Sequence, residues 1–306
     1  MRTEIRDGVW VTMPTPFTDD DRVDYPALEK MVDWYAEKGV DGLFAVCQSS
    51  EMFFLSPEER AEVGRFVTEK AAGRMQVVVS GHISDSPADQ LAELKRAAEA
   101  GSDAVVLVSN RLAGPEESEQ VWKDNASRIL EAMPDCSFGI YECPYPYKRL
   151  LSPELLRWCA ETGRFSFLKD TCCDLEQMKE KLDAVRGTGL KLFNANSATL
   201  LASLREGAAG FCGVMANFHP ELYVRLTHHW KEEPETAEKL QHFATAASLI
   251  ELQDYPRCAK YHMSLCGLPV GLHCRTKPDS NWNRLREIET EALYGLWQDF
   301  RGALHS

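Results

Sequence analysis

The sequence has little that would place this chain in a membrane or on nucleic acid. Its first residues, MRTEIRDGVWVTMPTP, lack the apolar core of a secretory signal, and no apolar run approaches the roughly 18 residues of a membrane span. Lys and Arg number 34 against 47 Asp and Glu, which gives a net charge of −13. This excess of negative charge argues against nucleic acid or an anionic membrane as the main partner. We therefore expect a cytoplasmic protein whose partners are small molecules.

The ten cysteines do not form the patterns of a metal site or a disulfide framework. No two are spaced as C-x-x-C, the spacings of metal-ligand sets are missing, and the adjacent Cys172 and Cys173 suit a disulfide framework poorly. We interpret them as free thiols in a reducing compartment and expect no metal site. A dinucleotide-binding fold is also disfavoured, because no G-x-G-x-x-G follows the first apolar run.

Short apolar runs alternate with amphipathic stretches along most of the chain, a pattern typical of strand–helix units around a parallel sheet. The runs expected to be strands are Val9–Met13, Gly42–Val46, Gln76–Ser80, Ala104–Val108, Phe138–Tyr141, Phe165–Lys169, Lys191–Asn194 and Gly210–Val214. The helices expected between and after them are Tyr25–Lys38, Pro57–Ala72, Pro87–Ala100, Pro115–Met133, Pro153–Thr162, Asp174–Arg186, Ser197–Glu206 and Pro220–Trp230. Eight such units with short connections predict an α/β fold, a closed (β/α)8 or TIM barrel.

Helix start signals support this reading of the chain. Ser-Pro pairs beginning at Ser56, Ser86 and Ser152 place a capping serine before a proline in the first helical turn. After Trp230 the pattern changes to helices without intervening strands, over Glu233–Gln253, Tyr255–Cys266 and Asn283–Phe300. We therefore predict a barrel over residues 1–230 and a C-terminal helical extension over residues 231–306.

Lys169 is the candidate catalytic residue, because it ends a short apolar run that reads as a buried strand. Burial disfavours the ammonium form of a lysine and so favours the nucleophilic amine that Schiff-base chemistry needs. Side chains alternate along a strand, so Phe165, Phe167 and Lys169 should share one face while Asp170 takes the other. A solvated strand-end lysine would explain this segment if it stood alone. In a barrel, however, a lysine that projects into the interior either forms an ion pair or takes part in the reaction.

Other candidate site residues lie at the predicted carboxyl ends of neighbouring strands, where barrel enzymes carry their chemistry. Tyr141 ends the strand before that of Lys169 and could move a proton between substrate and amine, or simply fill the barrel mouth. Gln48, Ser49 and Ser50 form a short turn whose hydroxyl and N–H groups could hold a carboxylate, although an ordinary strand-to-helix turn would look the same. We add Cys212 to the substrate-binding candidates and expect its thiol to pack rather than attack.

Two histidines, His82 and His219, also fall near strand ends. Either could assist proton transfer, but a hydrogen-bonded position at the rim of the barrel explains them as well. Of the two roles, we expect the hydrogen-bonded rim position for both histidines.

Four segments in order resemble the dihydrodipicolinate synthase and N-acetylneuraminate lyase superfamily of Schiff-base aldolases. Gly8–Phe17 looks like the family's opening strand and T-P-F turn, and Gln48-Ser-Ser-Glu51 stands where the family has G-T-T-G-E or G-S-T-G-E. Tyr141-Glu-Cys-Pro144 is similar to Y-N-x-P and precedes Lys169 by 169 − 141 = 28 residues. Gly207–Asn217 looks like the family's eighth-strand glycine turn and A-N.

This resemblance covers about the whole chain and implies a function. It implies that Lys169 forms an imine with pyruvate or another 2-oxo acid, that Tyr141 relays protons, and that Gln48 and Ser49 hold the carboxylate. The second substrate would be an aldehyde or a sugar acid. The resemblance further implies a homotetramer built as a dimer of dimers, and a lyase or aldolase reaction without metal or organic cofactor.

The chain also departs from the family pattern. The arginine that the synthases place two residues after Y-N-x-P is replaced by Pro146, and the tyrosine pair after strand four is replaced within Val108–Leu112. Three alternatives to a general carbon–carbon lyase therefore stay open. They are a true 4-hydroxy-tetrahydrodipicolinate synthase, a sugar-acid dehydratase using the polar rim residues Asn194, Asn196 and His82, and a catalytically silent ligand-binding relative.

Overall fold

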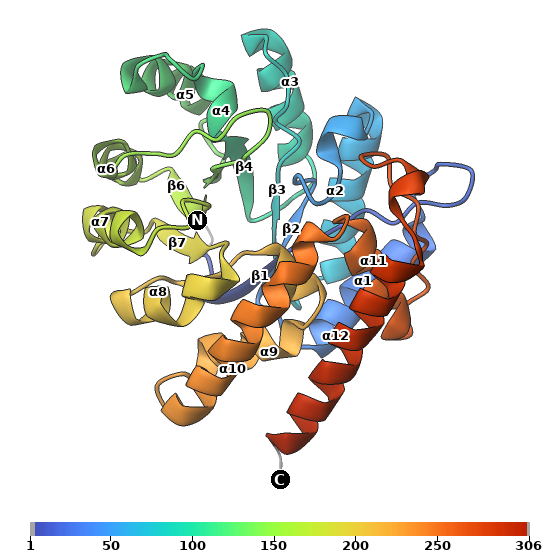
Figure 1. Cartoon of the computed structure of the whole chain (residues 1–306). Coiled ribbons are helices and arrows are strands. Elements are labelled where there is room, and N and C mark those ends of the chain that lie inside the picture. Colours follow the sequence, from blue (N-terminus) through green and yellow to red (C-terminus); the bar gives the residue numbers. More distant parts are fainter. Residues whose placement is uncertain (1–3, 305–306) are drawn as a thin grey trace.

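The computed structural model describes residues 4–304, and these residues form a closed barrel of eight parallel strands surrounded by helices (Figure 1). The strands are β1 (Gly8–Thr12), β2 (Gly42–Ala45), β3 (Gln76–Val79), β4 (Ala104–Val108), β5 (Phe138–Tyr141), β6 (Phe165–Asp170), β7 (Lys191–Asn194) and β8 (Gly210–Phe211). They pair in sequence order and β8 closes the barrel on β1. The TIM barrel expected from the sequence is confirmed. The strand ends match the prediction within one residue, except that β8 is shorter because Val214 begins a 3-10 turn.

The α-helices alternate with the strands and continue beyond the barrel. They are α1 (Tyr25–Glu37), α2 (Pro57–Ala71), α3 (Pro87–Ala98), α4 (Ser109–Leu112), α5 (Glu119–Ala132), α6 (Pro153–Glu161), α7 (Leu175–Val185), α8 (Leu200–Glu206), α9 (Pro220–His229), α10 (Pro234–Ala247), α11 (Arg257–Leu265) and α12 (Arg284–Ala303). The 3-10 helices are η1 (Met52–Phe54), η2 (Ser197–Thr199), η3 (Val214–Asn217), η4 (Ser248–Leu252) and η5 (Asp279–Asn281). Within residues 4–304 no helix combines the length and apolar character that crossing a membrane requires.

The expected serine caps are present. The side chains of Ser56, Ser86 and Ser152 each accept a hydrogen bond from a backbone N–H in the first turn of α2, α3 and α6. Ser56 and Glu59 form a complete capping box. Each cap of this kind stabilises a helix by about 1 kcal/mol.

Two predicted helices differ most from the structure in their extent. The helix predicted over Pro115–Met133 begins only at Glu119, because Gly114 and Glu117 form a turn in which the Glu117 carboxylate accepts the Gly114 N–H at 2.6 Å. The helix predicted over Glu233–Gln253 ends at Ala247 and continues as the 3-10 helix η4. This second change matters for function, because η4 approaches the open end of the barrel.

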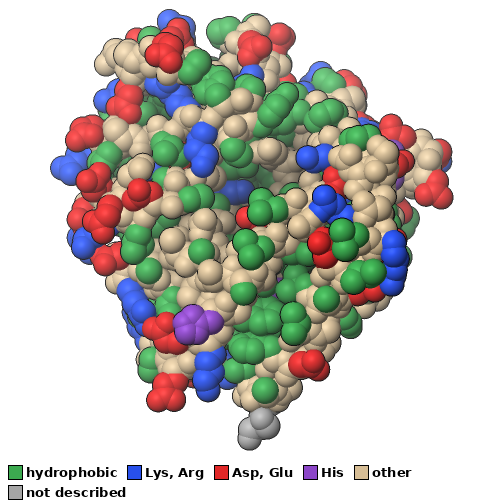
Figure 2. All heavy atoms as spheres, viewed as in Figure 1, with side chains coloured by type: hydrophobic (Ala, Val, Ile, Leu, Met, Phe, Trp, Pro, Cys, Tyr) green, Lys and Arg blue, Asp and Glu red, His purple; other side chains and the backbone are tan. Residues whose placement is uncertain are grey.

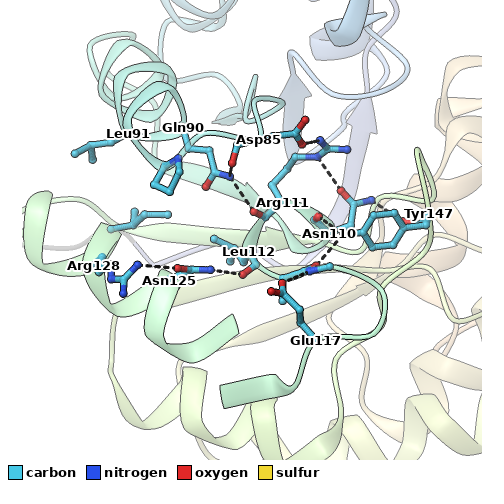
Figure 3. Close-up of a pocket in the computed structure, with 14 residues that line it drawn as sticks. Asp85, Gln90, Leu91, Asn110, Arg111, Leu112, Glu117, Asn125, Arg128 and Tyr147 are labelled. Carbon is cyan, nitrogen blue, oxygen red and sulfur yellow. Dashed lines mark hydrogen bonds and ion pairs between the residues drawn. The ribbon is translucent and has the colours of Figure 1, made fainter. Parts of the chain in front are cut away.

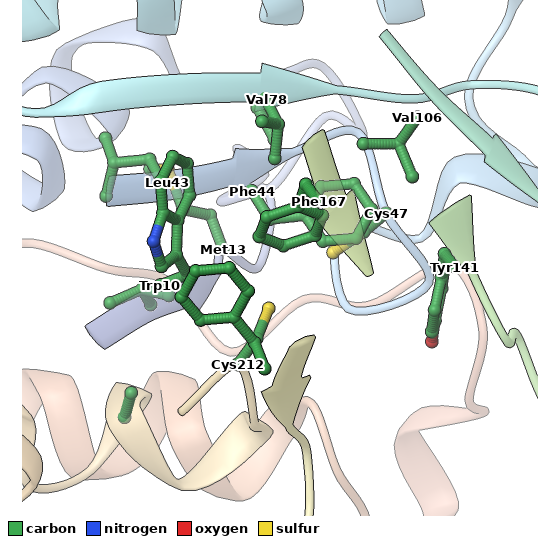
Figure 4. Packing of buried hydrophobic residues seen from close by; sticks show 14 of the residues in the cluster. Trp10, Met13, Leu43, Phe44, Cys47, Val78, Val106, Tyr141, Phe167 and Cys212 are labelled. Atoms are coloured by element: carbon green, nitrogen blue, oxygen red, sulfur yellow. The ribbon is translucent and has the colours of Figure 1, made fainter. Parts of the chain in front are cut away.

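The barrel interior is filled by aromatic side chains that support the strand carrying Lys169 (Figure 4). Phe167 stacks on Phe193 with ring centres 4.9 Å apart, and Trp10 meets Phe167 edge-on at 5.2 Å. Gly42 makes room for this indole, since a Cβ there would lie 2.3 Å from a Trp10 ring carbon. These contacts form a solid floor beneath the carboxyl ends of the strands.

The prediction that Phe165 shares a face with Phe167 and Lys169 is wrong. The pairing of β5 with β6 shifts register between Phe138 and Gly139. As a result, the Phe165 ring lies 6.5 Å from that of Trp122 in α5, outside the barrel, whereas Phe167 points inside. The alternation holds beyond the irregularity, so Lys169 still points inward.

Candidate active site

An open cavity of about 350 Å³ lies at the carboxyl ends of the barrel strands, with Lys169 among the residues that line it. Figure 2 shows this face hollowed near its centre, with a basic side chain inside the hollow. The lining residues are Gln48, Ser49, Tyr141, Pro144, Lys169, Thr171, Ala195, Gly213, Val214, Glu251, Tyr255, Pro256, Thr276 and Lys277. The cavity therefore brings together four of the residues singled out in the sequence: Gln48, Ser49, Tyr141 and Lys169.

Lys169 is buried in β6, with 3% of its surface exposed, and it is the register partner of Tyr141 in β5. Its Nζ lies 4.4 Å from the centre of the Tyr141 ring and 6.0 Å from that of Phe44. Among the described residues no carboxylate forms an ion pair with it. The amine is therefore held against aromatic faces and left open to the cavity.

Asp170 points away from the cavity, as strand alternation predicts. Its carboxylate pairs with Lys181 of α7 at 2.6 Å, and the same ammonium pairs with Glu142 at 2.7 Å. All three side chains are at most 2% exposed. This buried ionic cluster, which the sequence did not indicate, lies directly behind Tyr141 and Lys169 and ties together the ends of β5 and β6.

Tyr141 is a buried neutral phenol. Burial raises its pKa well above the usual range, and the neighbouring thiols of Cys143 and Cys47 raise it further. Its hydroxyl donates to Gln48 Oε1 at 3.4 Å, a long hydrogen bond that a bound molecule could replace. The phenol can thus donate a proton or hydrogen bond to a group on the Lys169 side of the cavity.

The Gln48–Ser50 turn is only partly available for binding. Gln48 and Ser49 line the cavity, whereas Ser50 does not. Ser50 Oγ donates to the Met13 carbonyl at 2.6 Å and accepts from the Cys47 N–H at 3.1 Å. This serine fixes the turn against β1, so the structure assigns its hydroxyl a structural role.

Cys212 is fully buried among the interior side chains and is not part of the cavity lining (Figure 4). Burial raises the pKa of its thiol to about 12, so the sulfur stays protonated at neutral pH. It lies close enough to Lys169 for the ammonium to oppose that shift. All ten cysteines of the chain are free thiols.

The polar rim residues outside this set serve the fold. His82 Nδ1 accepts from the Val108 N–H at 3.0 Å, and burial lowers the pKa of His82 to about 4. The Asn194 amide donates to Thr199 and Ser203, and the Asn196 side chain caps η2. None of the three lines the cavity.

His219 lies away from the cavity, beneath α12. Its ring centre is 4.9 Å from that of His262 and 5.1 Å from that of Trp297. Neither ring nitrogen has a hydrogen-bond partner among residues 4–304. The expectation of a hydrogen-bonded rim histidine is therefore wrong for His219, which is buried in the packing of the C-terminal helices.

One wall of the cavity, contributed by the C-terminal extension, was not predicted from the sequence; it consists of Glu251, Tyr255, Pro256, Thr276 and Lys277. Glu51 holds part of this wall in place. Its buried carboxylate accepts the N–H groups of Arg275 at 2.6 Å and Thr276 at 2.8 Å and pairs with Lys260 at 3.0 Å. More than 200 residues separate these partners, so no local signal could have revealed them.

A second cavity of about 270 Å³ lies between α3 and α5 (Figure 3). Its polar groups are largely occupied with one another, as the Arg111 guanidinium pairs with Asp85 at 2.7 Å and donates to Asn110 Oδ1 at 3.1 Å. The Asn110 amide also binds the carbonyls of Cys143, Tyr145 and Tyr147, so it fixes the loop after β5. None of the sequence-predicted site residues lines this second cavity.

No group of three or more potential metal ligands is formed by the part of the chain that the structure describes.

Comparisons of the sequence with known proteins point to one family. The sequence profile of the dihydrodipicolinate synthetase family matches residues 6–283. A 4-hydroxy-tetrahydrodipicolinate synthase of Gluconacetobacter diazotrophicus is 26% identical over 300 residues, which cover 97% of this chain and 99% of that protein.

Solved structures agree on the fold. One of them is a prophage protein of the dihydrodipicolinic acid synthase family from E. coli K12, solved in complex with pyruvate. It superposes on this chain with a TM-score of 0.84 at 22% identity, and the match covers 96% of this chain and 98% of that one. A dihydrodipicolinate synthase from Bacillus anthracis gives 0.86 at 19% identity, covering 96% and 99%.

Proposed function

This chain belongs to the dihydrodipicolinate synthetase family, and from that membership we propose that it is a lyase or aldolase whose Lys169 forms an imine with pyruvate or another 2-oxo acid. The observation that carries the proposal is the position of Lys169. Its amine is buried on a barrel strand, open to a cavity of about 350 Å³, and not ion-paired with any residue among 4–304. The pyruvate complex of the prophage protein, a structural relative, supports a 2-oxo acid as ligand.

The proposed reaction follows from a lysine and a phenol on adjacent strands. Lys169 Nζ attacks the C2 carbonyl, the carbinolamine loses water, and a protonated imine forms. This imine accepts the electron pair when the bond between C3 and C4 breaks, while the hydroxyl on C4 gives its proton to the Tyr141 phenolate and becomes the carbonyl of the released aldehyde. The resulting enamine is then protonated at C3. Hydrolysis releases the 2-oxo acid and restores the amine. Condensation is the same sequence read backwards.

Tyr141 is assigned the proton transfers. Its pKa is raised by burial, so the phenol carries a proton at neutral pH and can donate it to the departing hydroxyl of the carbinolamine. Gln48 and Ser49, on the wall beside Tyr141, would hold the carboxylate of the 2-oxo acid. Ser50 and Cys212 have no direct contact with substrate in this scheme.

The structure favours some alternatives over others. Asn194, Asn196 and His82, on which the dehydratase alternative depends, lie outside the cavity lining. True 4-hydroxy-tetrahydrodipicolinate synthesis is the activity named for the sequence relatives. It remains the second candidate, although Pro146 replaces the arginine and Asn110 occupies the region of the tyrosine pair. The homotetramer also stays a prediction, which analytical ultracentrifugation would test.

The proposal can be tested before the second substrate is known. An imine that interconverts with an enamine exchanges the methyl protons of pyruvate for deuterium in D2O, and proton NMR follows this loss directly. We expect rapid exchange with the wild type and none above background with Lys169→Met. Binding of pyruvate without exchange would favour the catalytically silent relative. Release of a 2-oxo acid from sugar acids without carbon–carbon cleavage would favour the dehydratase.

A further inference from the structure

Tyr255 is a cavity-lining phenol that the proposed reaction does not use. It lies between η4 and α11 in the C-terminal extension, and both Tyr255 and Ser49 line the cavity. Burial raises the pKa of Tyr255 well above its usual range, and a hydrogen-bonding contact with the Ser49 hydroxyl opposes that shift. The phenol therefore carries its proton at neutral pH, and the direction of that proton decides what the phenol can do.

Asn217, the last residue of η3, fixes this direction. Its buried side-chain nitrogen donates to the carbonyls of Thr12 and Val214, both at 2.9 Å, so the amide cannot be turned over to exchange nitrogen and oxygen. Its oxygen accepts the Tyr35 hydroxyl at 2.6 Å. The same nitrogen lies 3.1 Å from the Tyr255 oxygen, toward which it can only donate. The phenol proton must consequently point away from Asn217.

The Ser49 hydroxyl is the acceptor that remains for this proton. Among the described side chains, only those of Asn217 and Ser49 form hydrogen bonds with the Tyr255 hydroxyl. Since Asn217 donates, Tyr255 must donate to the Ser49 oxygen. A hydroxyl that accepts through its oxygen keeps its own hydrogen available, and Ser49 lines the cavity. The donors are thus aligned in one direction, from Asn217 through Tyr255 to Ser49 and the cavity.

We propose that Tyr255 directs the Ser49 hydroxyl as a hydrogen-bond donor toward the carboxylate of the 2-oxo acid, which makes Tyr255 a positioning residue for the first substrate. This assignment rests on the proposed lysine-imine function. A donor that is already oriented binds an anion with a smaller loss of rotational freedom, and aligned hydrogen bonds strengthen one another. Through Tyr255 the C-terminal extension takes part in binding the 2-oxo acid.

The test follows exchange of pyruvate methyl protons in D2O over a range of pyruvate concentrations, which gives a KM and a maximal rate without any aldehyde. The variants are Tyr255→Phe, Ser49→Ala and the double variant. Tyr223→Phe is the matched control, because its phenol also contacts a serine hydroxyl, that of Ser197 at 2.8 Å, and neither residue lines the cavity. Melting temperatures report any loss of the fold.

We expect Tyr255→Phe to raise the KM for pyruvate by about 2- to 10-fold, the effect of one neutral hydrogen bond, and to leave the maximal rate within about 2-fold of the wild type. Ser49→Ala should raise KM by about 10- to 100-fold, because it removes a hydrogen bond to a charged group. The double variant should match Ser49→Ala, since Tyr255 acts through the missing hydroxyl. Tyr223→Phe should leave KM unchanged.

Three results would overturn the positioning role. They are an unchanged KM in Tyr255→Phe, losses that multiply in the double variant, or an equal rise in KM in Tyr223→Phe. Multiplying losses would mean that the phenol and Ser49 act independently, and an equal rise in the control would mean a general effect on the fold. Absence of methyl exchange in the wild type would instead overturn the lysine-imine function, and the assignment with it.

Discussion

The buried cluster of Lys181, Glu142 and Asp170 gives the sharpest prediction on stability. Lys181→Met keeps the aliphatic volume but removes the ammonium that lies 2.7 Å from Glu142 and 2.6 Å from Asp170. Breaking a buried ion pair by removing one partner costs about 3–5 kcal/mol, because the remaining charge stays buried. For a chain of this size roughly 2 °C is lost per kcal/mol, so the melting temperature should fall by about 6–10 °C.

The cost should depend on pH in a defined direction. Burial and the nearby charge of Asp170 already raise the pKa of Glu142, and Lys181 opposes them. Without Lys181 the Glu142 carboxylate is expected to bind its proton more tightly in the folded state, so the folded variant loses stability as pH rises. The loss in Lys181→Met should therefore be larger at pH 8 than at pH 5.5.

The assay is thermal unfolding followed by circular dichroism, with Lys179→Met as the matched control on the same helix. Lys179 is 51% exposed and lies 3.7 Å from Glu206, so its removal should shift the melting temperature by no more than about 2 °C. The triple variant Glu142→Gln, Asp170→Asn, Lys181→Met, which is neutral, should recover much of the loss. Equal shifts for Lys181→Met and Lys179→Met, or a loss that does not grow with pH, would refute the reasoning.

Three further predictions concern catalysis, pH and the barrel closure. Tyr141→Phe should slow pyruvate methyl exchange by about 100-fold or more without a change in melting temperature beyond about 2 °C, and unaltered exchange would contradict its proton-relay role. Burial lowers the pKa of His82 to about 4, so its contribution to stability is complete above pH 6.5 and is lost as pH falls toward 4, by up to about 3 kcal/mol. The melting temperature should therefore fall less on acidification in His82→Asn than in the wild type. Equal falls in melting temperature for the two proteins would contradict this prediction. Gly210→Ala would bring a Cβ within 1.8 Å of the Gly8 carbonyl oxygen and should abolish soluble expression, whereas Gly295→Ala, with nothing within 4 Å, should express normally.

The sequence predicted the barrel and the central pair because both depend on local patterns. Apolar runs of strand length alternate with capped helices, and the carboxyl ends of parallel strands must meet at one end of a barrel. Tyr141 and Lys169 therefore fall beside each other in register. Asp170 is likewise separated from Lys169 by strand alternation alone, and it pairs with Lys181 on the outer side.

The remaining features depend on contacts between distant segments or on irregular backbone. The register shift at Phe138 moves Phe165 out of the barrel, and no residue type marks such an irregularity in advance. The role of Ser50 depends on the Met13 carbonyl, 37 residues away. Glu251 and Thr276 reach the cavity only because the C-terminal extension folds back over the barrel, where Glu51 holds it.

The central claim, that Lys169 is the imine-forming residue, is tested most directly by reducing the protein with borohydride in the presence of pyruvate and measuring its intact mass. We predict that the wild type gains the mass of one pyruvic acid less one oxygen atom, that peptide mapping places this adduct on Lys169, and that Lys169→Met gains nothing. An adduct on another lysine, or no adduct with pyruvate or with larger 2-oxo acids, would contradict the account.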